Sequence, residues 1–189
     1  FSRDRASIII FEDDVEPGGD AANGLWAITE LVDEGTCEPW AISSSRSHSA
    51  THSWWIDDSD KRTAEVMDTP LINIPRQVTD PELRFWHYID TESSYDGGWL
   101  QYRKDNGAWT DVPKGIISKN AYNDRIGFQG SGIPSQVEKQ AWSGKPYAAF
   151  SEVVVDLTSL NLSGHMLNIR WRFESDGAVG GGGWWVDDV

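Results

Sequence analysis

Two acidic segments near opposite ends of the chain carry the residue types that best suit a hard cation. Residues 8–16 read Ile-Ile-Ile-Phe-Glu-Asp-Asp-Val-Glu, and residues 184–189 read Trp-Trp-Val-Asp-Asp-Val. Calcium takes about six to eight oxygen ligands in proteins, mostly from carboxylates and backbone carbonyls. The matching clusters therefore predict that the two ends of the chain meet and share a structural calcium ion.

Side-chain direction narrows the choice of ligands in each cluster. Asp14 and Glu16 share one face of an extended strand, whereas Asp13 faces the other way. Asp187 and Asp188 follow apolar residues that should be buried, and burying two acids there is unfavourable unless a positive charge neutralises them. The alternative is that both clusters are surface charges at strand ends, but their occurrence at both termini favours the cation.

Two further acidic segments lie inside the chain. Asp96 precedes Gly97-Gly98, where it is either another calcium ligand or the cap of its own turn. Residues 57–60 read Asp-Asp-Ser-Asp and look like the start of a cation-binding loop. They lack the Gly and the distal Glu of an EF-hand, so we expect a solvated loop there.

No segment of the sequence carries a recognisable catalytic motif. His48 and His52 have the spacing of a zinc-binding helix, but Ser49 stands where that motif needs a Glu, and the Ser- and Thr-rich surroundings favour a loop or strand. The sequence contains no nucleophile elbow, phosphate loop or Cys/His cluster. A triad or a carboxylate pair assembled from distant residues stays open. We therefore expect a chain that is not an enzyme.

Bulk composition limits the classes of partner. The formal net charge of -14 argues against nucleic acid, because phosphate binding needs clustered Lys and Arg. No apolar run approaches the ~20 residues needed to cross a membrane, so no membrane insertion is expected. Cys37 is the only cysteine, which rules out an intrachain disulfide and leaves a metal as the more suitable staple. The chain starts at Phe1 and ends at Val189 within a strand pattern, which we interpret as a piece of a longer protein.

Alternation of apolar and polar residues with a period of two dominates the chain and predicts β-strands. It is clearest over residues 167–174, which read as a strand with one buried face. Residues 83–90 read as a strand that is apolar on nearly both faces. Residues 105–107 (Asp-Asn-Gly) predict a hairpin turn, and the Gly- and Ser-rich stretch 114–147 reads as a long decorating loop. Eleven tryptophans and 18 glycines also favour strands and turns over helices. We therefore predict one all-β domain over residues 1–189, a two-sheet antiparallel jelly-roll sandwich with long loops.

Some of the aromatic residues are candidates for ligand contact. The pairs Trp54-Trp55 and Trp184-Trp185 each place one ring on either face of a sheet, so one ring of each pair should be core and the other should point outward. Exposed Trp rings stack on sugars or anchor protein partners. Trp55, and Trp142 in the long loop, are the candidate ligand-binding residues. They support an alternative function, a carbohydrate-binding module that uses exposed Trp platforms.

The order of these motifs resembles a known domain type. The chain resembles the MAM-like, concanavalin-type jelly-roll domains that are appended to secreted bacterial peptidases, notably the immune inhibitor A group. The resemblance rests on blocks that follow one another in order and span nearly the whole chain. They are residues 11–16, 24–26, 83–88, 91–99, 140–144, 154–157, 167–173 and 183–189.

The resemblance implies a fold, a location and a ligand set. It implies a two-sheet sandwich that is secreted and extracellular and that often binds calcium. Carried over to this chain, the calcium ligands are acidic residues of three blocks: Asp14, Glu16, Asp96, Asp187 and Asp188. The implied function is that of a non-catalytic, calcium-stabilised accessory module of a secreted bacterial hydrolase, a peptidase. It would attach to a substrate or surface, or support the catalytic domain. Its partners would be that neighbouring domain and an extracellular protein or glycan.

Overall fold

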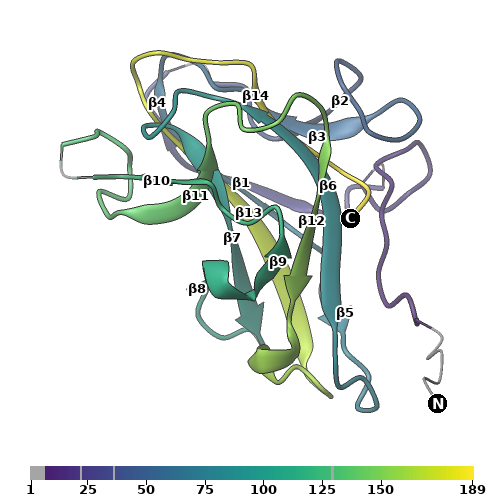
Figure 1. Cartoon of the computed structure of the whole chain (residues 1–189). Helices are drawn as coiled ribbons and strands as arrows, with labels where there is room; N and C mark the ends of the chain where they lie inside the picture. The colour runs from purple at the N-terminus through teal and green to yellow at the C-terminus, as the bar shows by residue number, and fades with distance from the viewer. Residues whose placement is uncertain (1–6, 22, 36, 129) are drawn as a thin grey trace.

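The computed structural model describes residues 7–21, 23–35, 37–128 and 130–189, which form two antiparallel sheets packed face to face (Figure 1). The larger sheet has eight strands, and six of them follow the order β1 (Ala27–Asp33), β4 (Arg62–Asp68), β13 (Met166–Asp176), β7 (Gly97–Lys104), β11 (Lys139–Ser143) and β10 (Asp124–Ile126). Its other two strands are β5 (Ile72–Asn73), which pairs with β13, and β8 (Thr110–Asp111), which pairs with β7. The smaller sheet has six strands in the order β2 (Ala41–Ser43), β3 (Ser53–Ile56), β14 (Gly183–Asp187), β6 (Glu82–Asp90), β12 (Ser151–Asp156) and β9 (Ile117–Lys119).

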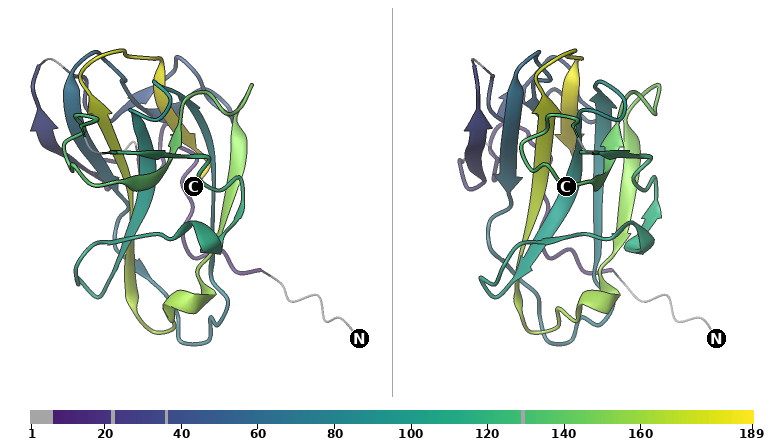
Figure 2. Two further views of the ribbon diagram at one scale, coloured as in Figure 1. Left: turned by 60° about the vertical axis from the view of Figure 1, so that its left-hand side comes forward. Right: turned by 90° about the vertical axis from the view of Figure 1, so that its left-hand side faces the viewer.

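Helical structure is confined to two short 3-10 turns, η1 (Lys114–Ile116) and η2 (Thr158–Leu160). Figure 2 shows the long strands running side by side, with the connecting loops gathered at both ends. A search of the described residues finds no helix with the length and apolarity that a membrane crossing requires. The predicted all-β, two-sheet antiparallel sandwich is confirmed.

The core lies between the two sheets and follows from alternation along the strands. Four alternate residues of β13 face it and are buried: Leu167, Ile169, Trp171 and Phe173. From the other sheet, Phe85 of β6 packs edge-on against Trp171 with ring centroids 5.4 Å apart. β6 lies between β14 and β12, as expected for a strand that is apolar on nearly both faces.

Two local predictions had different outcomes. The hairpin at residues 105–107 is confirmed, because β7 and β8 pair on either side of it and Asp105 and Asn106 have φ angles of 51° and 58°. The predicted long loop 114–147 is wrong, since it contains η1, β9, β10 and β11. These strands are too short to show a period of two against their Gly- and Ser-rich surroundings.

The two ends of the chain meet, as the sequence predicts. Asp13 N donates to Val189 O at 2.8 Å, and Val189 N donates to Asp13 O at 2.9 Å. The Asp13 carboxylate is buried and accepts hydrogen bonds from Val15 N, Ala21 N and Trp26 Nε1. Backbone pairing therefore holds the termini together without a shared ion, while the Asp13 carboxylate fixes the fold of the N-terminal segment up to Trp26.

His87 is a fully buried titratable group in the core. Its ring packs against Phe85, Trp142, Tyr147 and Trp184, and its Nδ1 accepts a hydrogen bond from Trp184 Nε1 at 3.2 Å. Burial lowers the pKa of His87 to about 3, so the ring stays neutral in the folded protein. Tyr147 is the only titratable neighbour among these contacts, and it is neutral below pH 7.

Acidification is therefore expected to destabilise the fold through His87. Between pH 6.5 and about pH 3 the unfolded chain binds a proton at His87 that the folded chain does not. The His87 contribution to the free energy of unfolding should thus fall by about 1 kcal/mol per pH unit as the pH drops. Buried carboxylates with raised pKa values act in the opposite direction in every variant, so the difference between the wild type and His87→Leu in denaturant titrations at pH 6 and pH 5 measures it. His87→Leu should lose this contribution, whereas His165→Gln, at a partly exposed histidine paired with Asp105, should keep it. Equal slopes for the wild type and His87→Leu would contradict the assignment.

Candidate metal centre and ligand face

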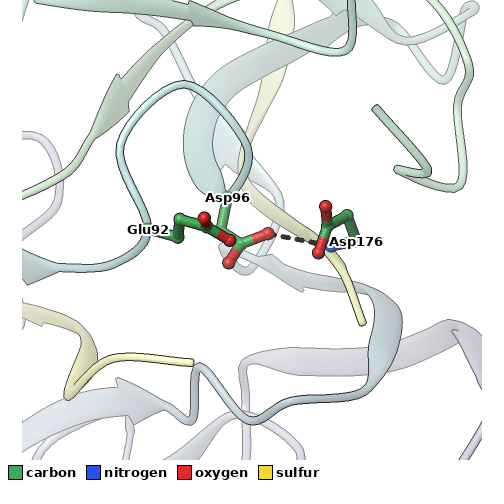
Figure 3. A group of neighbouring side chains, drawn as sticks. All are labelled: Glu92, Asp96 and Asp176. Carbon is green, nitrogen blue, oxygen red and sulfur yellow. Dashed lines mark hydrogen bonds between the residues drawn. The ribbon is translucent and has the colours of Figure 1, made fainter. Parts of the chain in front are cut away.

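Four carboxylates gather at one end of the sandwich. Three of them, Glu92, Asp96 and Asp176, each place an oxygen within 4.8 Å of the others (Figure 3). Asp58 is the fourth, and its carboxylate faces that of Asp96. We refer to Asp58, Glu92, Asp96 and Asp176 as the acidic centre.

The turn between β6 and β7 positions two of these residues. Asp96 N donates to Glu92 O at 3.0 Å, and Asp96 O accepts hydrogen bonds from Thr91 Oγ1 at 3.1 Å and Ser143 Oγ at 2.6 Å. Asp176 is the last residue of β13, and its N–H donates to Asp96 Oδ1 at 2.8 Å (Figure 3). Contacts between distant segments, and not alternation along one strand, assemble the acidic centre.

Asp58 lies between β3 and β4 and is only 1% exposed. In the described part of the chain, neither of its carboxylate oxygens has a hydrogen-bond partner of normal geometry, and the same holds for Glu92 Oε2. Burial, and next the charge of Asp96, raise the pKa of Asp58 far above its usual range. Burial is also the main cause that raises the pKa of Asp96. Buried neighbouring carboxylates are unfavourable unless protons or a cation neutralise them.

The donor set of the acidic centre suits a hard divalent cation. Its side-chain donors are all carboxylate oxygens. Calcium accepts such ligands in flexible geometry, whereas zinc and copper favour nitrogen and sulfur. A cation would also displace protons from carboxylates whose pKa values are raised. The expectation of a solvated loop over residues 57–60 is therefore wrong for Asp58, which is buried, whereas Asp60 is exposed as expected. The orphaned oxygens of Asp58 suit a metal ligand.

The glycine run 180–183 allows the chain to pass close to the backbone beside the acidic centre. A Cβ atom on Gly180 would lie 2.2 Å from Asp58 O, and one on Gly181 would lie 2.3 Å from Asp90 O. Gly181 N donates to Asp58 O at 2.9 Å. Because only glycine permits such an approach, these residues hold the backbone of Asp58 in place.

The structure divides the five predicted calcium ligands between two places. Asp96 belongs to the acidic centre, but β14 runs antiparallel to β6 and puts Asp187 opposite Trp86, away from the turn that holds Asp96. Asp187 Oδ2 instead accepts hydrogen bonds from the N–H groups of His48 at 2.7 Å and Ser49 at 3.2 Å. Burial raises the pKa of Asp187 to about 6.

Asp188 and Glu16 hold the same loop between β2 and β3. Asp188 Oδ2 lies 2.5 Å from His48 Nδ1. Glu16 accepts hydrogen bonds from Thr51 N at 2.7 Å and His52 N at 2.8 Å. Hydrogen bonds from Thr51, and then from His52, lower the pKa of Glu16 to about 2. The two histidines thus make hydrogen bonds, as the sequence predicts, but their carboxylate partners come from the two ends of the chain.

Asp14 completes the predicted set and is exposed. Its Oδ1 accepts a hydrogen bond from Glu16 N at 3.1 Å. The terminal carboxylates Asp14, Glu16, Asp187 and Asp188 are therefore satisfied by donors of the chain itself and do not converge with Asp96. The sequence shows acids at both ends, but it does not show that the loop between β2 and β3 supplies their partners.

The two predicted ligand-binding tryptophans differ in exposure. Trp142 is fully buried in β11, and its Nε1 donates to Asn120 O at 2.8 Å, so the prediction of an exposed platform is wrong for it. Trp55 is partly exposed on the outer side of the six-stranded sheet, and its Nε1 donates to Gly182 O at 3.1 Å. Trp55 therefore stays a candidate for ligand contact.

A polar face with one partly exposed tryptophan lies on the outer side of the eight-stranded sheet. The Trp109 ring stacks on Arg170, whose Cζ lies 3.8 Å from the ring centroid, and Arg103 Cζ lies 4.7 Å from the same ring. Arg170 donates two hydrogen bonds to Asp68 at 2.6 and 2.8 Å. Arg103 Nε donates to Asn168 Oδ1 at 3.0 Å. We refer to this group as the ligand face: Gln101, Arg103, Trp109, Asn168 and Arg170.

Hydrogen bonds around Asp111 fix one side of the ligand face. Asp111 Oδ1 accepts from Gln101 Nε2 at 2.8 Å and Trp99 Nε1 at 3.0 Å, while Oδ2 lies 2.8 Å from Lys139 Nζ. Gln101 Oε1 is buried and has no partner among the residues described. The sequence did not reveal this face, because Trp109 falls in a short hairpin arm and its neighbours read only as polar members of alternating strands.

Comparison with known proteins finds similarity in fold alone. No protein-family model matches the chain, and no well-characterised protein sequence matches it either. Similar solved structures include TmCBM61 in complex with β-1,4-galactotriose, at 11% identity over 86% of this chain and 84% of that chain, with a TM-score of 0.49. CBM28, a carbohydrate-binding module specific for non-crystalline cellulose, is 17% identical over 79% of each chain, with a TM-score of 0.40. The glycoside hydrolase domain of Endo-D from Streptococcus pneumoniae R6 is 13% identical over 86% of this chain but only 21% of that chain, with a TM-score of 0.45.

Proposed function

We propose that the chain is a non-catalytic carbohydrate-binding module whose fold is stabilised by a calcium ion in the acidic centre. The ligand face carries the first part of this proposal, because it combines a partly exposed aromatic ring with fixed polar side chains. Asp58 carries the second part, as a buried carboxylate with no hydrogen-bond partner of normal geometry among the described residues. The fold similarity is too remote to name a ligand, so the proposal rests on the chain's own residues.

Calcium in the acidic centre would be structural. Asp58, Glu92, Asp96 and Asp176 would hold it, with further oxygens from water or the backbone. The ion would neutralise carboxylates that otherwise share protons or repel one another. These residues come from the loop before β4, the turn between β6 and β7, and the end of β13. Tying three segments together stabilises the folded state, because the unfolded chain has no such site.

The ligand face has the chemistry that sugar recognition requires. An indole ring offers an apolar surface to the C–H groups of a pyranose, and a few fixed polar groups set its orientation. Trp109 is held against Arg170, which is itself fixed by Asp68. Arg103 and Asn168 lie next to the ring and can bond hydroxyl groups of a ligand. The face is therefore already ordered, which lowers the entropy lost on binding.

Burial of the acidic centre favours a cation over acid–base catalysis. Hydrolases also use carboxylate pairs with shifted pKa values. Asp58 and Asp96 are each only 1% exposed, so a substrate would not reach them. This supports an accessory module without catalytic activity of its own.

Trp109→Ala is expected to lower the affinity for a bound oligosaccharide about tenfold or more, because stacking on the ring is lost. A glycan array would identify the ligand, and calorimetry would then compare the variants. Trp55→Ala is the matched control, since it removes a partly exposed indole from the other sheet. Loss of binding in Trp55→Ala but not in Trp109→Ala would move the site to the six-stranded sheet. No binding to any glycan of the array would reject the carbohydrate proposal.

The resemblance to peptidase-appended domains supports a further expectation about the parent protein. The module would be secreted and would lie beside the catalytic domain of a bacterial hydrolase, such as a peptidase. It would then keep that domain near its substrate. Finding the coding sequence of a hydrolase next to this segment in the parent gene would support this arrangement, and its absence would argue against it.

A further inference from the structure

We infer that the ligand face recognises an acidic sugar, and that Arg103 binds the sugar's carboxylate. This inference rests on the proposed carbohydrate-binding function and names the class of ligand for the same site. Three features of the face lead to it: its charge, the fixed orientation of Arg103, and the groups that surround it.

The ligand face lies in a network with an excess of positive charge, although the chain as a whole has a formal net charge of -14. Four basic side chains and three carboxylates belong to the network: Arg103, Arg170, Arg172 and Lys139, with Asp68, Asp111 and Glu174. Arg170 pairs with Asp68, Arg172 with Glu174, and Lys139 with Asp111, all at 2.6 to 2.8 Å. Among the described residues, Arg103 is therefore the basic side chain of this network that has no carboxylate partner.

Arg103 is held in a defined orientation. Its Nε donates to Asn168 Oδ1 at 3.0 Å, and the amide of Asn168 is fixed in turn, because its Nδ2 donates to Thr69 O at 2.9 Å. Its Cζ lies 4.7 Å from the centroid of the Trp109 ring. No described residue accepts a hydrogen bond from its terminal nitrogens. A guanidinium group with an ordered Nε and unengaged terminal nitrogens is suited to binding one carboxylate.

The surroundings of Arg103 match the other parts of an acidic sugar. Trp109 provides an aromatic ring for the C–H face of a pyranose. Gln101 lies opposite Arg170 in the pairing of β7 with β13, and its Nε2 donates to Asp111 Oδ1 at 2.8 Å, which fixes the side of the face next to Arg103. A uronic acid supplies a ring face, hydroxyl donors and a carboxylate together, whereas a neutral sugar would leave Arg103 without a counter-charge. Nucleic acid fits poorly, because the rest of the chain is strongly acidic.

The test compares oligosaccharides that contain uronic acid with their methyl esters, which keep the sugar backbone and remove the charge. A set of neutral oligosaccharides is measured alongside them, all by calorimetry with the wild-type chain in calcium buffer. We expect at least one acidic oligosaccharide to bind with an affinity about tenfold or more above that of its ester. A charge-assisted hydrogen bond between Arg103 and the carboxylate provides a difference of this size. The preference should shrink as salt is raised.

Arg103→Gln is expected to remove the preference for the acid, so that the acid and its ester bind with equal affinity. Arg76→Gln is the matched control, since Arg76 is exposed in the loop between β5 and β6 and forms no ion pair among the described residues; it should keep the preference. Equal binding of acids and esters, or of neutral sugars alone, would overturn the acidic-sugar inference while the carbohydrate function stands. Absence of binding to every oligosaccharide would overturn both. The comparison of acid with ester uses the wild type, so it decides the inference even if Arg103→Gln folds poorly.

Discussion

Calcium is expected to raise the melting temperature of the metal-free protein by roughly 8–16 °C when it is present at about a thousand times its dissociation constant. Binding to the folded state alone then adds about 4 kcal/mol to the free energy of unfolding. For a domain of this size, each kcal/mol shifts the melting temperature by about 2–4 °C. Thermal unfolding after EGTA treatment, with and without added calcium, measures the shift.

Asp58→Asn separates the effect of the acidic centre from other effects of calcium. The amide is nearly isosteric and carries no charge, so it removes a calcium ligand and also relieves the crowding of buried carboxylates. We expect the metal-free variant to be at least as stable as the metal-free wild type, but to gain little from calcium. Asp14→Asn should keep the full calcium response, because Asp14 is exposed and lies in the other group of carboxylates. A calcium response that survives Asp58→Asn would place the ion elsewhere.

Gly181→Ala is expected to destabilise the fold by about 1–3 kcal/mol, the usual range for a substitution that forces the backbone to shift. A Cβ atom at residue 181 would lie 2.3 Å from the backbone oxygen of Asp90, and neither backbone can move away freely, because Gly181 N also bonds Asp58 O. Denaturant unfolding measures the loss. Displacement of this segment should also weaken calcium binding, since Asp58 depends on it for its position.

Gly182→Ala is the matched control for this substitution. The nearest atom to its added Cβ would be Cη2 of Trp185 at 3.2 Å, which belongs to a side chain and can give way by a few tenths of an ångström. We expect a change in stability of less than about 1 kcal/mol, because the lower entropy of the unfolded chain with Ala offsets the small shift of the Trp185 ring. If the two variants lost equal stability, the close approach of the backbone at Gly181 would not explain the glycine run.

Much of the fold could be predicted from the sequence, because its long strands repeat with a period of two. The alternation in residues 167–174 identifies β13, and the turn residues 105–107 identify the hairpin between β7 and β8. The meeting of the two termini could also be inferred, from acidic segments at both ends. Short strands were the exception, since β9, β10 and β11 have only three to five residues each and sit in a Gly- and Ser-rich stretch. The sequence therefore places Trp142 in a loop, although it belongs to the core.

The candidate site was harder to predict, because tertiary contacts assemble it. Asp96 was identified from its place before two glycines, but Asp58 was set aside because its surroundings lack an EF-hand pattern. That pattern describes a site within one loop, whereas the acidic centre takes residues from three separate segments. The reverse applies to Asp187 and Asp188, which look like ligands in the sequence but are satisfied by the loop between β2 and β3. Local spacing could not distinguish these two cases.

The ligand face escaped detection for a related reason. Trp109 lies just beyond a hairpin turn, and its partners Arg103 and Arg170 come from two strands that pair only in the folded chain. Each strand shows its polar positions, but not which of them will be neighbours. The ion pairs that leave Arg103 without a carboxylate are visible only once the strands are in register.

Calorimetric titration of calcium into the metal-free chain tests the metal assignment most directly. The account predicts one calcium ion bound per chain by the wild type. It predicts that Asp58→Asn and Asp96→Asn each weaken this binding severely, and that the double variant Asp14→Asn, Glu16→Gln leaves it intact. No calcium binding by the wild type, or binding that depends on Asp14 and Glu16 but not on Asp58, would contradict the acidic centre as the site of the ion.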